Sequence, residues 1–215
     1  MPQRKITNLL ALAVLATVIE RPMHPYEMAS LMRARGKEQD MEIKWGSLYR
    51  VVDNLVKHGF LVAAQSERQG GRPERTIYRI TDAGRAELVD WTRELIAVPD
   101  RRPGPFTAGL SVLAVLGPDD VAALLAQRAG ALDAEIAAAA ADLAGYAAEV
   151  PRLFLLEAEY AVAMRRAELA WVRALHDEIT EGTLPRLAEW RAFHQTGELP
   201  ADIAALAARR TEEKQ

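Results

Sequence analysis

The sequence predicts a mainly α-helical protein in two parts: helices with one β-hairpin, then a part made only of helices. Three observations support this class. Apolar residues recur every three to four positions along most of the chain, the period shortens to two around residues 75–80, and three prolines fall within residues 98–105. We therefore expect a domain over residues 1–97, a linker over 98–105 and a second domain over 106–215.

Composition limits the chemistry available to the chain. Its 215 residues are 50% hydrophobic and 27% charged, with a net charge of −3, which excludes a uniformly basic nucleic-acid coat. The chain has no cysteine and four scattered histidines, so we expect neither a metal site nor a cofactor. Residues 1–95 have three more basic than acidic residues, whereas residues 96–215 have six more acidic than basic residues. The first part is therefore the one expected to approach a polyanion.

The first helix is expected over Ile6–Glu20, where apolar residues recur at i, i+3, i+4 and i+7. The basic residues before it also resemble the start of a secretion signal, but no small-residue cleavage site follows. No apolar run reaches the ~18 residues that a membrane span requires. We therefore expect a cytoplasmic protein without a membrane partner.

The next two helices have recognisable ends. Pro25 suits the first position of a helix that runs to about Arg35, with Gly36 as its C-cap. Ser47 is expected to cap a third helix, which Gly59 ends. The buried stripe of this third helix is expected to be Leu48, Val52, Leu55 and Val56.

Two strands are expected over Phe60–Ala64 and Arg75–Ile80, around a polar loop that contains Gly70-Gly71. Thr81 then caps a helix over Asp82–Ala97. The order helix, helix, helix, hairpin, helix within about 90 residues is typical of a winged helix-turn-helix domain, whose third helix suits the major groove of DNA.

The polar face of the third helix has residues suited to that groove. Ser47 and Tyr49 can bind phosphate oxygens, and lysines at either end can neutralise phosphates. Arg50 and Asn54 lie one turn apart and suit guanine and adenine edges. For this helix alone a plain solvated face is the better explanation, but the arginine-rich hairpin shifts the balance to a polyanion partner. The predicted DNA-binding residues are Tyr26, Lys44, Ser47, Tyr49, Arg50, Asn54, Lys57, Arg68, Arg72 and Arg75.

Five short motifs in this part are specific in combination. They are His24-Pro25-Tyr26-Glu27-Met28, Trp45-Gly46-Ser47-Leu48-Tyr49, Gly59-Phe60-Leu61, Gly71-Arg72-Pro73 and the Tyr-x-x-Thr-x-x-Gly element from Tyr78 to Gly84. In them the chain resembles the PadR family of transcriptional regulators, strongly over residues 6–95 and in architecture alone over 106–180. Two positions depart from the family pattern: Pro25 stands where glycine is usual, and Arg50 where proline is usual.

The resemblance implies a dimeric, ligand-responsive repressor that dimerises through its C-terminal helices. It also implies that a small aromatic or amphipathic compound releases the DNA. Two other functions remain open at this point: a winged-helix module that docks a protein, and a MarR-like regulator with dimer helices at both ends of the chain. The operator, the regulated genes, the inducer and the choice between repression and activation stay undetermined.

The second part is predicted to form helices over residues 110–116, 119–149, 151–181, 184–195 and 201–210. The two long helices have wide apolar stripes, which need a partner surface, and a symmetric operator favours a two-fold partner. A homodimer is therefore predicted, with a monomeric bundle as the alternative; whether residues 184–210 join the dimer is open. The predicted dimerisation residues are Leu132, Ile136, Leu143, Leu153, Leu156, Tyr160 and Met164.

Aromatic residues near the expected junction of the two parts are candidates for an effector pocket. They are Trp91, Phe106, Tyr160 and Trp171, although plain core packing is the favoured interpretation of each. The chain contains no G-x-S-x-G motif, Walker loop or G-x-G-x-x-G motif, so we predict no catalytic residues and no enzyme activity.

Overall fold

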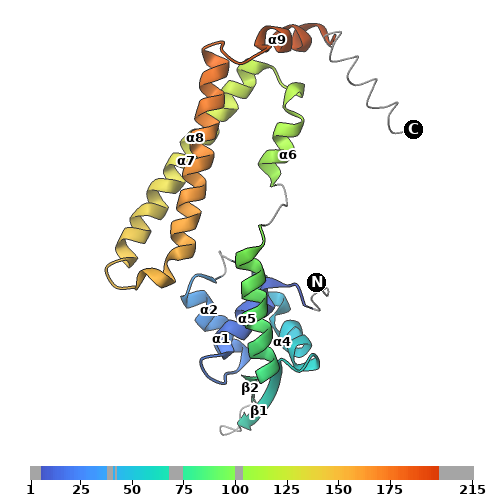
Figure 1. Ribbon diagram of the computed structural model, residues 1–215, viewed down its shortest axis with the longest axis vertical. Coiled ribbons are helices and arrows are strands. Elements are labelled where there is room, and N and C mark those ends of the chain that lie inside the picture. Colours follow the sequence, from blue (N-terminus) through green and yellow to red (C-terminus); the bar gives the residue numbers. More distant parts are fainter. Residues whose placement is uncertain (1–5, 38–40, 42, 68–74, 100–103, 199–215) are drawn as a thin grey trace, which may run out of the picture. The chain divides into compact units, whose positions relative to one another are not determined.

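A computed structural model describes the chain except for residues 1–5, 38–40, 42, 68–74, 100–103 and 199–215. The chain divides into two compact units, Met1–Arg101 and Arg102–Gln215. The first unit combines helices with a two-stranded sheet, and the second consists of helices (Figure 1). Each unit has a hydrophobic core of its own. The predicted class, a mainly α protein with a winged helix-turn-helix unit and a helical unit, is confirmed.

The first two helices begin at side-chain caps. The Asn8 side chain accepts a hydrogen bond from the Leu10 amide at 2.9 Å at the start of α1 (Leu9–Val18). This helix is buried nearly all round, rather than along one stripe as predicted, because α2, α4 and α5 all pack against it. Helix α2 (Pro25–Ala34) begins at the proline, as predicted, with His24 and Glu27 forming a capping box.

The third helix differs from its prediction at both its start and its buried stripe. A 3-10 turn, η1 (Trp45–Ser47), precedes α4 (Leu48–Lys57). The prediction of Ser47 as a side-chain cap is wrong. Its hydroxyl donates back to the Lys44 carbonyl at 2.8 Å, because the 3-10 turn brings that oxygen within reach. The buried stripe contains Val51, whereas Val56 is 36% exposed.

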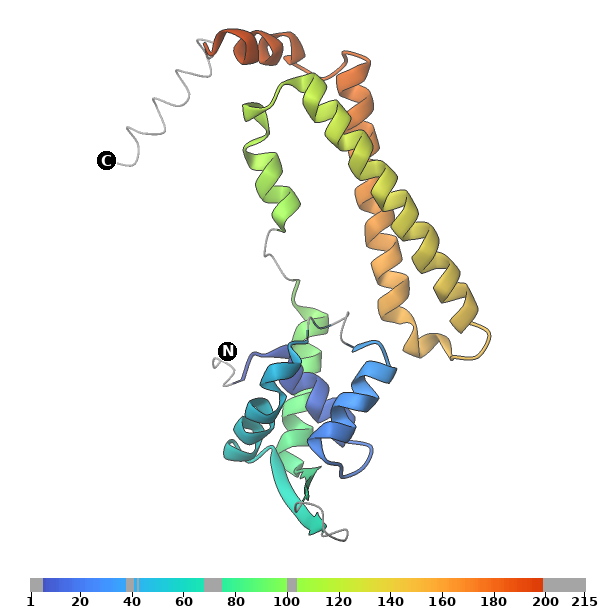
Figure 2. The ribbon, with the colours of Figure 1, turned by 180° about the vertical axis from the view of Figure 1, so that it is seen from behind.

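The sheet pairs β1 (Leu61–Glu67) with β2 (Arg75–Ile80) in antiparallel register, with a bulge between Ala63 and Gln65. The first strand extends three residues beyond the predicted Ala64. Met23 adds a short third segment, since its amide and carbonyl both bond to Tyr78 at 3.1 Å. Figure 2 shows the hairpin extending away from the helices of this unit.

Helix α5 (Asp82–Ala97) has the predicted bounds and the predicted Thr81 cap. The Thr81 hydroxyl oxygen accepts from the Gly84 amide at 3.0 Å and donates to the Gly59 carbonyl at 2.6 Å. One threonine therefore fastens the start of α5 to the turn after α4. The approach is close enough that Gly84 itself is buried against the Phe60 carbonyl.

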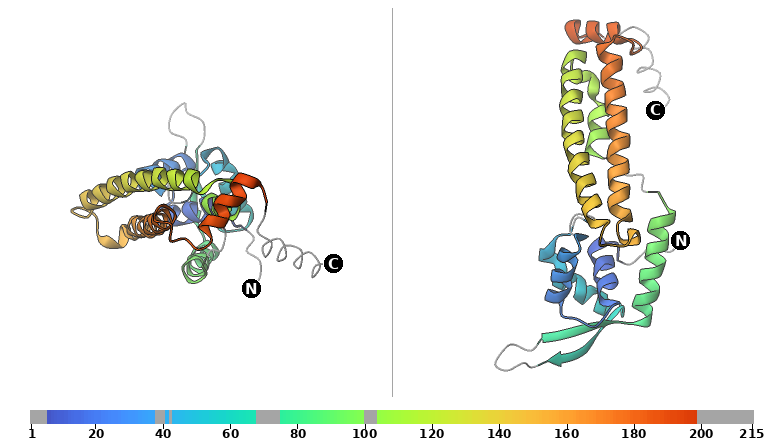
Figure 3. Two further views of the ribbon diagram at one scale, coloured as in Figure 1. Left: turned by 90° about the horizontal axis from the view of Figure 1, so that it is seen from above. Right: turned by 90° about the vertical axis from the view of Figure 1, so that its left-hand side faces the viewer.

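In the second unit two antiparallel helices, α7 (Pro118–Tyr146) and α8 (Leu156–Thr180), pack side by side (Figure 3). Their core joins Val121, Leu125 and Leu132 of α7 to Val172 and Ile179 of α8. The single helix predicted over residues 110–116 is wrong. The chain instead forms α6 (Pro105–Ser111) and a 3-10 turn, η2 (Leu113–Val115), because Pro105 starts a helix five residues earlier. A third 3-10 turn, η3 (Arg152–Phe154), precedes α8.

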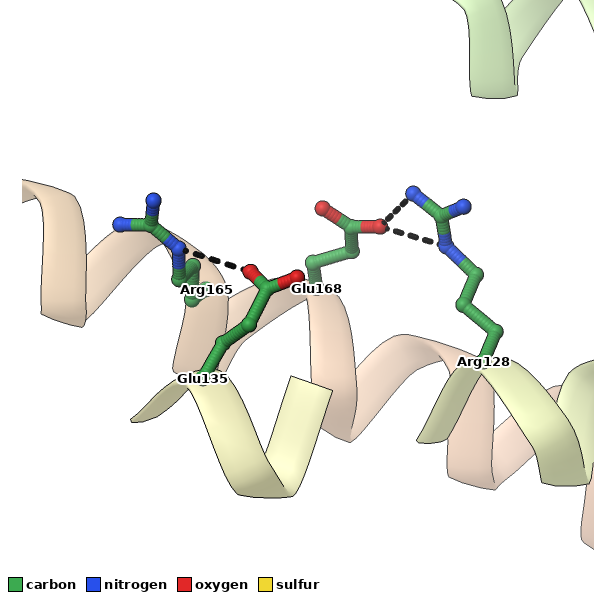
Figure 4. A network of polar contacts seen from close by, with 4 residues as sticks. All are labelled: Arg128, Glu135, Arg165 and Glu168. Carbon is green, nitrogen blue, oxygen red and sulfur yellow. Dashed lines mark hydrogen bonds and ion pairs between the residues drawn. The ribbon is translucent and has the colours of Figure 1, made fainter. Parts of the chain in front are cut away.

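Charged side chains link α7 and α8 along one side (Figure 4). Arg128 Nε donates to Glu168 at 2.7 Å, and Arg165 Nε donates to Glu135 at 3.3 Å. The Arg128 guanidinium also lies 3.8 Å from the centre of the Phe106 ring, which fastens α6 to the hairpin. Such half-exposed ion pairs contribute little stability each, so the apolar core between the helices dominates.

The last described helix, α9 (Leu187–Thr196), folds back on the start of α7. Trp190 Nε1 donates to the Leu116 carbonyl at 3.0 Å, and Arg191 pairs with Asp119 at 3.1 Å. The His194 ring covers Gly117, where an added β-carbon would lie 2.9 Å from that ring. The segment over 184–195 therefore packs on its own chain, and the helix predicted over 201–210 lies outside the described residues.

Candidate nucleic-acid interface

Helix α4 presents a polar face opposite the side that packs into the core. Tyr49, Arg50, Asn54 and Lys57 are all exposed on it, and Lys44 is exposed just before η1. At about 100° per residue these four α4 side chains fall within one arc of the helix. The structure thus brings together the predicted base-reading pair and the predicted phosphate contacts of this helix.

The start of α2 lies beside the start of α4. The His24 ring meets the Tyr49 ring edge-on, with centroids 6.4 Å apart. Tyr26, in the first turn of α2, is 68% exposed. Exposed tyrosines therefore stand at the start of α2 and at the start of α4, and tyrosine hydroxyls suit the phosphate contacts that position a helix in a groove. The Ser47 hydroxyl donates to the Lys44 carbonyl at 2.8 Å, so it would have to exchange that bond to donate to a phosphate.

Sequence reasoning missed one residue of this face, Asp53, which is exposed beside Asn54. The signal was present, since Asp53 stands three residues after Arg50 and shares its side of the helix. The Asp53 carboxylate lies close enough to the β1–β2 hairpin, the wing, to affect the pKa of Tyr78 on β2. Burial raises the pKa of Tyr78 above its usual value, and the nearby Asp53 carboxylate and Tyr49 phenol raise it further.

The wing residues are only partly described. Arg68 and Arg72 lie outside the described residues, and Arg75 begins β2 in register with Glu67. Arg79, which sequence reasoning left out of the predicted set, is exposed on β2 opposite Val62. The described part of the wing therefore provides one exposed arginine.

The second unit exposes an apolar surface on η3 and α8. We call it the α8 apolar surface, and its members are 45% to 71% exposed: Leu153, Leu156, Tyr160, Met164 and Trp171. The residues of α8 that pack on α7 belong to another stripe, which includes Val162, Leu169 and Val172. Four of the predicted dimerisation residues thus lie on the free surface.

The three predicted dimerisation residues of α7 lie elsewhere. Leu132 is buried and Ile136 is half-buried, both in the core that α7 shares with α8. Leu143 lines a hollow of about 570 Å³ at the end of the hairpin, together with Leu155 and Arg166. Leu132 and Ile136 therefore pack within the hairpin of their own chain.

The four aromatic effector candidates have different surroundings. Trp91 is 4% exposed and belongs to the core of the first unit. Phe106 and Trp171 contact each other edge-on in the second unit, with centroids 6.0 Å apart, and Tyr160 belongs to the α8 apolar surface. The structure therefore brings two of the four into contact.

Neither a metal cluster nor a membrane-spanning helix occurs in the described part of the chain. No group of three or more His, Asp or Glu side chains there is arranged to hold a metal ion. No helix among the described residues combines the length and hydropathy that crossing a membrane requires.

Residues 14–90 match the model of the PadR-like family of transcriptional regulators. The probable transcriptional regulator Rv1176c of Mycobacterium tuberculosis is 32% identical over 100 residues, which cover 45% of this chain and 49% of the relative. The matched region thus spans about half the length of that relative.

Solved structures resemble the chain over a larger share of its length. Bacillus subtilis PadR in complex with operator DNA matches with a TM-score of 0.65 and 19% identity, over 80% of this chain and 99% of that one. The same protein in complex with p-coumaric acid matches with a TM-score of 0.64 and 16% identity, over 83% and 99%. At these identities the likeness establishes the fold.

Proposed function

Because residues 14–90 match the model of the PadR-like family of transcriptional regulators, we propose that the chain is a regulator of this family, binds operator DNA as a homodimer and represses transcription. In this proposal a small aromatic or amphipathic compound releases the DNA. We place the protein in the cytoplasm and assign it no catalytic activity, since the family consists of regulators.

The exposed face of α4 is the observation that carries the proposal. An α-helix fits the major groove, where arginine pairs with guanine and asparagine with adenine. Arg50 and Asn54 are free to do this, because both are exposed on the side of α4 that faces away from the core. Tyr49 and Lys57 stand on the same face and suit phosphates. The fold is shared with Bacillus subtilis PadR, which has been crystallised with operator DNA.

The α8 apolar surface supports the homodimer. Five large apolar side chains exposed on η3 and α8 are costly in water, and such patches mark interaction sites. A two-fold axis through this surface would supply two α4 helices to a symmetric operator. A second copy of the chain is therefore the occupant we assign to it.

A competition gel shift tests the proposal as a whole. The probe is the duplex upstream of the protein's own gene, and random duplex serves as competitor at physiological salt. We expect a shift that excess random duplex does not abolish, because specific binding typically exceeds non-specific binding by 10³-fold or more. A winged-helix module that docks a protein would show weak binding, equal on both duplexes.

Substituting Arg50→Ala is expected to weaken operator binding by about 1–3 kcal/mol, or roughly 5- to 150-fold, and to relax base preference at one position. The physical reason is the loss of two hydrogen bonds to a guanine edge. Lys57→Ala is the matched control on the same helix; it should weaken operator and random duplex equally. An equal loss on both duplexes for Arg50→Ala would contradict base reading and leave a phosphate contact.

The effector proposal has its own test. p-Coumaric acid, which Bacillus subtilis PadR binds in a crystal, is expected to weaken operator binding about tenfold, within the usual range of coupling between two sites. Phe106→Ala should remove this response and leave binding in the absence of the compound unchanged, because Phe106 contacts Trp171 and Arg128 in the second unit. If saturating compound leaves the complex intact, this effector class is wrong and DNA binding stands.

A further inference from the structure

Asp53 is the one acidic residue within α4, whose sequence is LYRVVDNLVK. At about 100° per residue it lies roughly 40° from Tyr49 and roughly 60° from Arg50 around the helix axis. It therefore stands between them, within the arc of exposed side chains, and not at its edge. The residue is exposed, so its carboxylate faces whatever this helix binds.

The spacing of the helix offers Asp53 two cationic partners. Arg50 stands three residues before it and Lys57 four residues after it, which are the distances at which helical side chains form ion pairs. None of the hydrogen bonds or ion pairs between described residues joins Asp53 to either cation. The carboxylate thus keeps its acceptor positions for a ligand.

An acid at this point opposes simple attraction to phosphate. Each like charge brought toward the DNA backbone reduces the counterion release that drives non-specific binding. The same carboxylate is favoured opposite one base in the major groove. Cytosine presents an amino donor there, whereas guanine presents acceptors, thymine presents a carbonyl acceptor, and adenine places an acceptor nitrogen beside its amino group.

We propose that Asp53 is a specificity-determining residue, which accepts a hydrogen bond from the amino group of a cytosine in the operator. It also weakens binding to DNA that lacks cytosine at that position. This inference rests on the proposed function, because it requires that α4 enters the major groove. Arg50, Asp53 and Asn54 then read neighbouring bases with three different chemistries.

The test selects binding sites from a random duplex library with three full-length proteins: the wild type, Asp53→Asn and Asp53→Ala. We expect the wild-type motif to contain a cytosine that Asp53→Ala no longer selects. Asp53→Asn should select adenine there, because an amide pairs with both polar atoms of the adenine edge. Both variants should fold normally, since Asp53 is exposed, and circular dichroism checks this.

Titrations on chosen duplexes give the size of the effect. Changing the selected C·G pair should weaken the wild type about 10- to 100-fold and leave Asp53→Ala unchanged, which is the usual range for one base contact. Both variants should bind random duplex about threefold more tightly than the wild type, because a charge near phosphate is removed. Asp142→Asn on α7 makes the same charge change and should alter neither affinity.

Two different failures can be told apart. If both variants select the wild-type motif, Asp53 reads no base and the inference is overturned, while the proposed function stands. If the wild type selects no motif at all, the proposed function fails and the inference fails with it.

Discussion

Substituting Met164→Glu is expected to convert the proposed homodimer into a monomer of about 24 kDa and to weaken operator binding at least ~100-fold. Met164 is half exposed in the middle of the α8 apolar surface, so a charge there is solvated in the monomer and buried in the dimer. Loss of the partner removes the second α4 helix, and linkage of two binding modules typically adds a factor of 10²–10⁴. Analytical ultracentrifugation measures the mass, and a titration with operator duplex measures the affinity.

Gln195→Glu provides the control for this experiment. It introduces the same charge at an exposed position of α9, away from the α8 apolar surface, and should leave mass and affinity unchanged. A Met164→Glu protein that stays dimeric would contradict the interface assigned here. A monomer with undiminished operator affinity would contradict the need for two reading helices.

Gly84→Ala is expected to destabilise the first unit by about 3 kcal/mol, the upper end of the usual cost of overpacking. A β-carbon at this position would lie 2.2 Å from the Phe60 carbonyl oxygen and 2.9 Å from Ile80 Cγ1. The first of these atoms belongs to the backbone at the start of the hairpin. That backbone is fixed, because the Phe60 carbonyl also accepts a hydrogen bond from the Thr81 amide at 3.0 Å.

Urea unfolding of the full-length protein, followed by circular dichroism and by operator binding, measures this loss. Gly46→Ala is the control in the same unit: nothing lies within 4 Å of a β-carbon at that position. It should unfold at nearly the wild-type urea concentration. Equal stability of the Gly84→Ala and Gly46→Ala proteins would show that the turn between the sheet and α5 yields more easily than its hydrogen bonds indicate.

The sequence predicted best those elements whose ends are fixed by local chemistry. Pro25, Thr81 and Gly59 fix the ends of helices through their own backbone or hydroxyl groups, and α2 and α5 accordingly begin at the predicted residues. Prediction failed where tertiary contacts decide. The buried side of α4 includes Val51 rather than Val56. Both valines fit a helical apolar stripe, and the contacts of α4 with the rest of the core decide which of them is buried.

The candidate site shows the same division. The period of α4 was enough to place Tyr49, Arg50, Asn54 and Lys57 on one side of the helix. The predicted Ser47 cap was wrong, since a 3-10 turn that the sequence did not signal lets its hydroxyl donate to the Lys44 carbonyl. On α8 two apolar stripes coexist, and the sequence could not show which one packs on α7, because both have helical spacing.

The separate cores of the two units have a genetic consequence. The residues that hold the winged unit together and those that hold α7 against α8 belong to different clusters. In the proposed dimer, a chain with a damaged winged unit is therefore expected to keep its helical unit and to pair with normal chains. In a cell that makes both forms, most dimers then have at least one defective reading helix. Core substitutions in the winged unit should consequently be dominant over the normal gene, whereas substitutions that prevent pairing should be recessive.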